Sequence, residues 1–218
     1  MDMMRILAQE NSLMNQFISE LRNKEVQKDS LRFRRNMERI GEIFAYEISK
    51  HLNYKETTIE TPLGNSRMNL PNSKIVNATI LRAGLPFHNG FLNYFDTAEN
   101  AFISAHRKYH KDGTFTIQFE HLSSPEIDGK VLILSDPMLA SGASMEIAYK
   151  ALLERGTPTH THIVTIIASN EGIKHVKKHI NMKNVSIWAG DVDDELTSKS
   201  YIVPGLGDAG DLAYGSKM

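Results

Sequence analysis

The sequence contains no cysteine among its 218 residues. This absence excludes disulfide frameworks, thiolate metal sites and cysteine nucleophiles together. Long apolar runs are also missing, and none approaches the ~18 residues that a membrane helix needs. The N-terminal stretch carries an acid at Asp2 and no sustained apolar segment, which predicts neither a secretory signal nor a membrane anchor. We therefore expect a soluble cytoplasmic protein.

An excess of either charge is missing as well. The 25 Lys and Arg residues face 26 Asp and Glu residues, for a formal net charge of -1. This balance argues against a protein that grips nucleic acid through bulk electrostatics. Hydrophobic residues make up 41% and charged residues 23%, which is typical of a globular protein. The length suits one domain, and we expect residues 1–218 to form it.

Hydrophobic periodicity indicates how the chain is organised. Apolar residues at steps of three and four predict two N-terminal helices, one over Leu13–Leu21 and one that starts at Asp29 or Ser30. Alternating strands and helices follow: strands at 130–135, 162–168 and 185–188, and helices at 144–155 and 171–180. This alternation predicts right-handed crossovers. We expect an α/β fold, with a central parallel sheet flanked by helices and an N-terminal helical addition.

The middle of the chain predicts further strands. Residues 57–61 and 74–81 are strand-like, and a short helix is expected after Gly84. A strand at 101–105 precedes a hairpin that turns at Asp112-Gly113, since Asp-Gly supplies the positive φ angles of such turns. We expect this exposed hairpin to serve as a dimer arm or a lid.

The strongest local signal for chemistry lies at residues 132–144. A buried strand ends in Asp136, and small residues then open a helix. Small residues let backbone N–H groups approach a ligand, and a helix start favours anions, so the turn suits a phosphate. Asp136 would face the crevice at the carboxyl end of the strand and suits sugar hydroxyls. On this pattern alone, an ordinary strand-to-helix turn capped by Asp or Ser is an equally good interpretation.

Three segments together resemble one family. Residues 135–144 (SDPMLASGAS) resemble the loop that binds phosphoribosyl diphosphate (PRPP) in type I phosphoribosyltransferases, in the form found in the uracil branch. Residues 80–85 (ILRAGL) are similar to that family's diphosphate loop, which often holds a non-proline cis peptide. Residues 201–211 (YIVPGLGDAGD) look like the C-terminal uracil-binding segment.

The resemblance implies a fold, a reaction and a set of site residues. It implies the type I phosphoribosyltransferase fold, the conversion of uracil and PRPP to UMP and diphosphate, Mg²⁺ carried by PRPP, and a homodimer or a larger homo-oligomer. No nucleic acid or membrane partner is expected. The implied catalytic residues are Asp136, Arg82, Arg107 and Asp208. The same four residues would bind PRPP together with Pro137, Met138, Leu139, Ala140, Ser141, Gly142, Ala143 and Ser144. Uracil would be read by Ile202, Gly207, Asp208 and Ala209, largely through backbone groups, and Mg²⁺ could lie near Asp208.

The sequence also departs from the family's pattern. The differing positions are Pro86, Asn89, Ser141, Ala143 and Leu212. Two alternatives therefore stay open, a pyrimidine-responsive RNA-binding regulator and a catalytically silent homologue that binds uracil or UMP. A regulator should show a basic face and need not keep the segment 201–211, and this sequence has the reverse.

Histidines give little sign of a metal site. His160 and His162 share one face of a strand without a nearby third ligand, so we expect surface residues. The basic residues of HVKKHI, at 175–180, are expected to form a solvated helix face.

Overall fold

The computed structural model of the protein describes residues 4–109 and 115–216. Within these residues the main sheet has the strand order β1-β10-β9-β7-β4-β5-β6, and β8 pairs with β9. Neighbouring strands run parallel except for β5 and β6, which are antiparallel. The strands are β1 Met4–Ile6, β4 Ile75–Leu81, β5 Glu99–Tyr109, β6 Phe115–Ser123, β7 Val131–Ser135, β8 Met138–Leu139, β9 His160–Ser169 and β10 Val185–Asp193.

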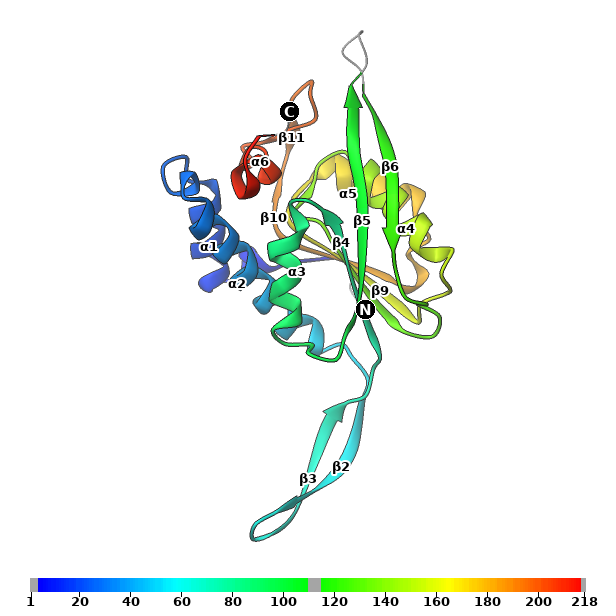
Figure 1. Cartoon of the computed structure of the whole chain (residues 1–218). Coiled ribbons are helices and arrows are strands. Elements are labelled where there is room, and N and C mark those ends of the chain that lie inside the picture. The colour runs from blue at the N-terminus through cyan, green and yellow to red at the C-terminus, as the bar shows by residue number, and fades with distance from the viewer. Residues whose placement is uncertain (1–3, 110–114, 217–218) are drawn as a thin grey trace.

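Helices cover both faces of this sheet, which confirms the expected α/β fold (Figure 1). One face carries α1 Leu13–Arg22, α2 Ser30–Ser49 and α3 Gly84–Leu92, and the other carries α4 Ala143–Leu153 and α5 Asn170–His179. The smaller elements are η1 Leu7–Gln9, η2 Val26–Lys28, η3 Met182–Asn184, β11 Glu195–Leu196, β12 Ile202–Val203 and α6 Ala209–Tyr214. None of the helices within the described residues is both long and apolar enough to cross a membrane.

The N-terminal helices form where the periodicity predicted them. Asp29 caps α2 by accepting a hydrogen bond from the backbone N–H of Arg32 at 3.0 Å, which satisfies one of the free donors of the first turn. The apolar stripe of α2 is fully buried at Phe33, Met37 and Phe44. It packs beside α3 and Trp188 of β10 in one hydrophobic core, while α4 and α5 share a second core on the opposite face.

Two hairpins project from the sheet (Figure 1). The expected one is β5–β6, in which the strand expected at 101–105 is the first half of a single long strand. Its turn at Asp112-Gly113 lies outside the described residues. The other hairpin, β2 Tyr54–Thr61 with β3 Gly64–Pro71, was predicted only in its first strand. We call it the β2–β3 arm.

The expectation that His162 lies on the surface is wrong. His162 is 2% exposed, and its Nδ1 accepts a hydrogen bond from Trp188 Nε1 at 3.0 Å. Burial, followed by the neighbouring His160 and His51, lowers the pKa of His162 to about 3. His162 thus fills the core as a neutral side chain, because its strand is covered on both faces.

Candidate active site

A cavity of about 600 Å³ lies at the carboxyl ends of the parallel strands. Most of its wall comes from three separate parts of the chain, namely the end of β4, the segment after β7 and the C-terminal segment, and β5 adds Ala105. The lining residues are Ile80, Leu81, Arg82, Ala83, Ala105, Asp136, Met138, Ala140, Ser144, Ser200, Tyr201, Ile202, Gly207, Asp208, Ala209, Gly210 and Asp211. These are the three segments that the sequence singled out.

The loop 136–144 is fixed to β9 along its first half. The backbone N–H of Leu139 donates to Thr165 Oγ1 at 3.1 Å, and Ser169 Oγ donates to the carbonyl oxygen of Ala140 at 2.5 Å. Ser169 also accepts from the backbone N–H of Gly172 at 2.8 Å, so it joins the loop to the first turn of α5. The loop is therefore held in place without a ligand.

The second half of the loop opens α4 without a side-chain cap. Gly142 is the N-cap residue at φ +82°, and no side chain satisfies the N–H groups that follow it. A Cβ at Gly142 would lie 2.9 Å from the carbonyl oxygen of Gly172 and 2.9 Å from His175 Cβ. Both the backbone angle and the close packing thus require glycine. Uncapped N–H groups at a helix start, with Ala140 and Ser144 on the cavity wall, suit a bound anion.

Arg82 spans the cavity from the end of β4 to α6. The peptide bond between Leu81 and Arg82 is cis, which agrees with the form that the resemblance implied. Arg82 Nη2 donates to Asp211 Oδ1 at 3.3 Å and to the carbonyl oxygen of Gly215 at 3.2 Å. Arg82 and Asp211 are each 40% exposed, so solvent screens this ion pair. A second anion arriving in the cavity could replace Asp211 as the partner of Arg82.

Asp208 begins α6. Its Oδ1 accepts from the backbone N–H of Asp211 at 3.0 Å, which makes it the N-cap residue. The short side chains of Gly207, Ala209 and Gly210 leave backbone groups at the cavity wall. This part of the site therefore offers a flat ligand mostly main-chain donors and acceptors.

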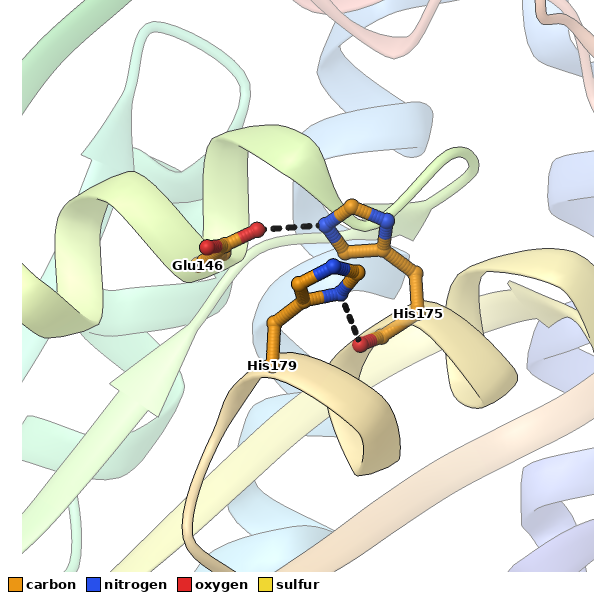
Figure 2. Close-up of side chains that lie close together, drawn as sticks. All are labelled: Glu146, His175 and His179. Atoms are coloured by element: carbon orange, nitrogen blue, oxygen red, sulfur yellow. Dashed lines mark hydrogen bonds and ion pairs between the residues drawn. The ribbon is translucent and has the colours of Figure 1, made fainter.

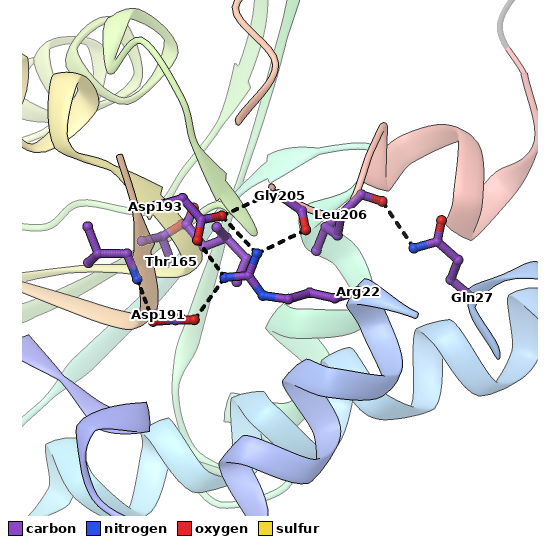
Figure 3. A network of polar contacts seen from close by, with 9 residues as sticks. Arg22, Gln27, Thr165, Asp191, Asp193, Gly205 and Leu206 are labelled. Carbon is purple, nitrogen blue, oxygen red and sulfur yellow. Dashed lines mark hydrogen bonds and ion pairs between the residues drawn. The ribbon is translucent and has the colours of Figure 1, made fainter. Parts of the chain in front are cut away.

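A polar network behind the C-terminal segment was missed by the sequence analysis (Figure 3). Arg22 of α1 donates to both carboxylate oxygens of Asp193 at 2.8 and 2.9 Å, to Asp191 Oδ2 at 2.8 Å and to the carbonyl oxygen of Gly205 at 2.9 Å. Asp193 also accepts from the backbone N–H of Gly205 at 2.9 Å, and Gln27 donates to the carbonyl oxygen of Leu206 at 3.1 Å. The network ties the C-terminal segment to α1 and β10.

The electrostatics of the network agree with its geometry. Burial alone would lower the pKa of Arg22, but its hydrogen bonds to Asp193 and Asp191 outweigh burial and raise that pKa above its ordinary value. The side chain of Asp193 is only 6% exposed. A buried carboxylate of this kind needs its cationic partner. Arg22 and Asp193 are 171 residues apart in the chain, and nothing in the sequence marks them as partners.

Most of the expected site residues reach the cavity. Arg82, Asp136, Met138, Ala140, Ser144, Ile202, Gly207, Asp208 and Ala209 line it. Pro137, Leu139, Ser141, Gly142 and Ala143 belong to the same loop but are not among its lining residues. Arg107 lies on β5, near the hairpin end, in a stretch where the structure describes only the backbone.

The departures from the family's pattern are compatible with the fold. Pro86 lies in the first turn of α3, where a backbone N–H has no partner within the helix and its loss is tolerated. Asn89 lies on the same helix and is exposed. Leu212 packs against the hydrophobic core, and its Cδ1 would lie 3.9 Å from a Cβ at Gly207. Leu212 therefore supports the wall of the site from behind.

A mostly parallel sheet with a cavity at the carboxyl ends of its strands is the arrangement in which open α/β proteins bind their ligands. Comparison with known proteins narrows this class. The family model for uracil phosphoribosyltransferase matches residues 8–216. The chain belongs to the uracil phosphoribosyltransferase family.

Individual relatives support the same grouping. The chain is 55% identical to a uracil phosphoribosyltransferase of Porphyromonas gingivalis over 97% of this chain and 98% of the relative. It is 38% identical to the enzyme of the same name from Methanothermobacter thermautotrophicus, over 86% of this chain and 85% of that one. A solved structure of a protein from Aquifex aeolicus is 32% identical, covers 98% of both chains and superposes with a TM-score of 0.85.

Proposed function

We propose that the protein transfers the phosphoribosyl group of PRPP to uracil and releases UMP and diphosphate. The observation that carries the proposal is the cavity itself, in which three segments far apart in the sequence meet. One segment suits a phosphate, one carries a cation for a diphosphate, and one offers backbone groups to a base. Family membership supports the same reaction.

The loop 136–144 would hold the ribose phosphate end of PRPP. The free N–H groups at the start of α4 and the hydroxyl of Ser144 suit the 5′-phosphate. Asp136, which begins this loop directly after β7, would accept hydrogen bonds from the ribose hydroxyls. A carboxylate cannot usefully bind phosphate, so the two ends of this loop recognise different parts of one substrate.

Arg82 and Arg107 would bind the diphosphate. Arg82 faces the cavity, and its present partner Asp211 is half exposed and easily exchanged. In the reaction the C1′–O bond breaks and its electron pair leaves with the diphosphate, while uracil N1 attacks C1′ from the opposite face and gives up its proton. The protein's contribution is to position both substrates and to stabilise the charge of the leaving group.

The C-terminal segment would read the base. Backbone groups of Ile202, Gly207 and Ala209 line the cavity and would pair with the N3–H donor and the O4 acceptor of uracil. Cytosine presents the reverse order, and fixed backbone groups cannot rotate to suit both. Sites built on such hydrogen bonds reject the mismatched base by roughly 10⁴-fold or more. Asp208 would lie between base and PRPP.

Mg²⁺ fits this cavity as an ion carried by the substrate. The cavity wall holds three carboxylates, Asp136, Asp208 and Asp211, which are the oxygen ligands that Mg²⁺ prefers. Asp208 already caps α6 and Asp211 pairs with Arg82, so few oxygens remain for direct coordination. The ion would supply positive charge to the diphosphate and keep most of its waters.

We further infer at least a homodimer, with the β2–β3 arm as the contact. The arm projects from the body and exposes apolar side chains, with Leu63 fully exposed and Met68 51% exposed. A hairpin of two strands is only marginally stable alone in water. Packing against a second copy of the chain would stabilise the arm and cover its apolar side chains.

Conversion of radiolabelled uracil with PRPP and Mg²⁺ tests the proposal. Formation of UMP, with 5-fluorouracil accepted and cytosine ignored, is the expected result. Uracil or UMP binding without turnover would favour the silent homologue, and specific RNA binding without turnover would favour the regulator. Efficient use of cytosine or a purine would overturn the backbone reading of the base.

A further inference from the structure

A cluster of two histidines and one glutamate joins α4 to α5, and none of the three residues lines the cavity (Figure 2). His175 and His179 lie one turn apart on α5, and Glu146 comes from the first turn of α4. The ligand atoms that these three side chains offer all lie within 4.8 Å of one another. The expectation that HVKKHI forms a wholly solvated face is therefore wrong for His175, which is only 27% exposed.

The hydrogen bond of His179 leaves a metal-binding lone pair in place. His179 Nδ1 lies 2.9 Å from the carbonyl oxygen of His175. A carbonyl oxygen only accepts, so this bond fixes the proton on Nδ1 and leaves the lone pair on Nε2. An imidazole that donates its other N–H to a backbone carbonyl is the usual arrangement of a metal ligand.

The carboxylate of Glu146 is also held in position by hydrogen bonds. Its Oε1 accepts from Lys150 at 2.5 Å, and its Oε2 lies 2.5 Å from His175 Nε2. Glu146 thus presents a carboxylate that Lys150 of its own helix holds at one oxygen and that faces His175 of α5 with the other.

We propose that Glu146, His175 and His179 form a binding site for one divalent transition-metal ion of the zinc class, which clamps α4 to α5. Two imidazoles and one carboxylate are a donor set that Zn²⁺ accepts, with water as the fourth ligand. Bond lengths of ~2.1 Å in a tetrahedral site place ligand atoms about 3.4 Å apart. The ion would take the place of the proton between Glu146 and His175, and the two side chains need to separate by only about 1 Å.

The position of the site beside the loop 136–144 indicates what the clamp would stabilise. The first turn of α5 packs directly on the loop, because a Cβ at Gly172 would lie 2.4 Å from the carbonyl oxygen of Ala140. Glu146 is bonded through its backbone N–H to the carbonyl oxygen of Gly142 at 3.0 Å. A metal ion that joins Glu146 to α5 would therefore brace the loop from behind.

Binding of ZnCl₂ and CoCl₂ to the full chain, first stripped with chelator and kept free of PRPP and uracil, tests the site. We expect one Zn²⁺ per chain by titration calorimetry. We also expect a melting temperature that rises by about 5–10 °C when free Zn²⁺ reaches about 100 times its Kd. Cobalt should give the visible absorption bands of a tetrahedral centre.

Matched variants locate the binding. His179→Ala changes an exposed side chain and should weaken Zn²⁺ binding at least ~10-fold, and Glu146→Gln should do the same. His121→Ala, which removes another exposed histidine, should leave the affinity unchanged. The melting temperatures of the metal-free variants show whether each one folds.

Two results would overturn the proposal: no saturable Zn²⁺ binding by calorimetry, or equal binding by the wild type and His179→Ala. Since no substrate is present, either result leaves the proposed transferase reaction untouched. Loss of activity in the transferase assay would likewise leave the metal site untouched.

Discussion

Substitution of Arg22 by alanine should loosen the C-terminal segment while leaving the rest of the site in place. Arg22 makes four hydrogen bonds, two to Asp193, one to Asp191 and one to the carbonyl oxygen of Gly205. The pair with Asp191 is partly screened, because that carboxylate is 40% exposed, and it contributes little. The pair with Asp193 is different, because its carboxylate is only 6% exposed and would be left without a cation.

The cost follows from that uncompensated carboxylate. Breaking a buried ion pair by removing one partner destabilises a protein by about 3–5 kcal/mol. Arg22 itself is 19% exposed and water can enter once it is gone, so we expect the lower end, about 3 kcal/mol. For a chain of this size that loss lowers the melting temperature by about 6–12 °C.

The effect on catalysis should fall more on the use of uracil than on the use of PRPP. The hydrogen bonds of Arg22, Asp193 and Gln27 hold Gly205 and Leu206, which belong to the segment that would read the base, and none of these bonds goes to the loop 136–144. We expect the KM for uracil to rise several-fold more than the KM for PRPP in steady-state kinetics on the folded variant at low temperature.

A matched arginine gives the control. Arg35 is 53% exposed and pairs with Glu38 at 2.6 Å on the same helix. Arg35→Ala should cost less than about 1 kcal/mol and change neither KM. Equal melting temperatures for the two variants, or a larger change in the PRPP KM than in the uracil KM, would refute the positioning role of Arg22.

Three further changes should have distinct results. Asp136→Asn should fold normally but lower kcat/KM at least ~10-fold, because hydrogen bonds to charged groups contribute about 1.5–3 kcal/mol. Gly142→Ala should lower the melting temperature and raise the PRPP KM, because its Cβ would lie 2.9 Å from the carbonyl oxygen of Gly172 at φ +82°. His162, with a folded pKa of about 3 against an ordinary value of 6.5, stabilises the fold fully above pH 6.5 and loses this contribution as pH falls toward 3. His162→Gln should therefore flatten the stability curve below pH 6.5, as measured by urea unfolding.

Each of these results has a clear opposite. Unchanged kinetics with PRPP would remove Asp136 from the site, and a normal melting temperature for Gly142→Ala would show that the loop does not pack tightly on α5. The His162 contribution amounts to about 2 kcal/mol between pH 6.5 and 5, at 1.36 kcal/mol per unit. His88, with a pKa of about 4, and His160 and His51, whose pKa values burial also lowers, should preserve the rest of the slope. An unchanged slope would mean that His162 is already charged.

The sequence predicted those parts of the fold in which local pattern and tertiary environment agree. The buried strand before Asp136 is apolar up to Ser135, and the stripe of α2 repeats at helical spacing, so each pattern has one good interpretation. The β2–β3 arm could not be predicted from its pattern in the same way. Its strands are exposed on nearly every side chain, so no alternation of buried and exposed residues marks them.

In the candidate site, too, the sequence predicts contiguous residues but not contacts between residues far apart in the chain. Residues of the loop 136–144 and of the C-terminal segment are contiguous, and their small side chains are visible as a pattern in the sequence. Asp211 lies in the C-terminal motif, but the sequence does not reveal its ion pair with Arg82, because the two residues are 129 positions apart. Such pairs are set by the topology of the sheet, which brings strand ends together regardless of their distance in sequence.

His162 and His175 show why residue type alone misleads. Both were expected to face solvent. His162 lies on a central strand that helices cover on both sides, so its ring is buried whatever its polarity, and Trp188 and Ser186 supply its hydrogen bonds. His175 is brought to Glu146 because α5 packs closely on the loop through Gly172. The contact that fixes the loop from behind is thus the same one that assembles the histidine and glutamate cluster, and neither could be read from the chain without the crossing of α4 and α5.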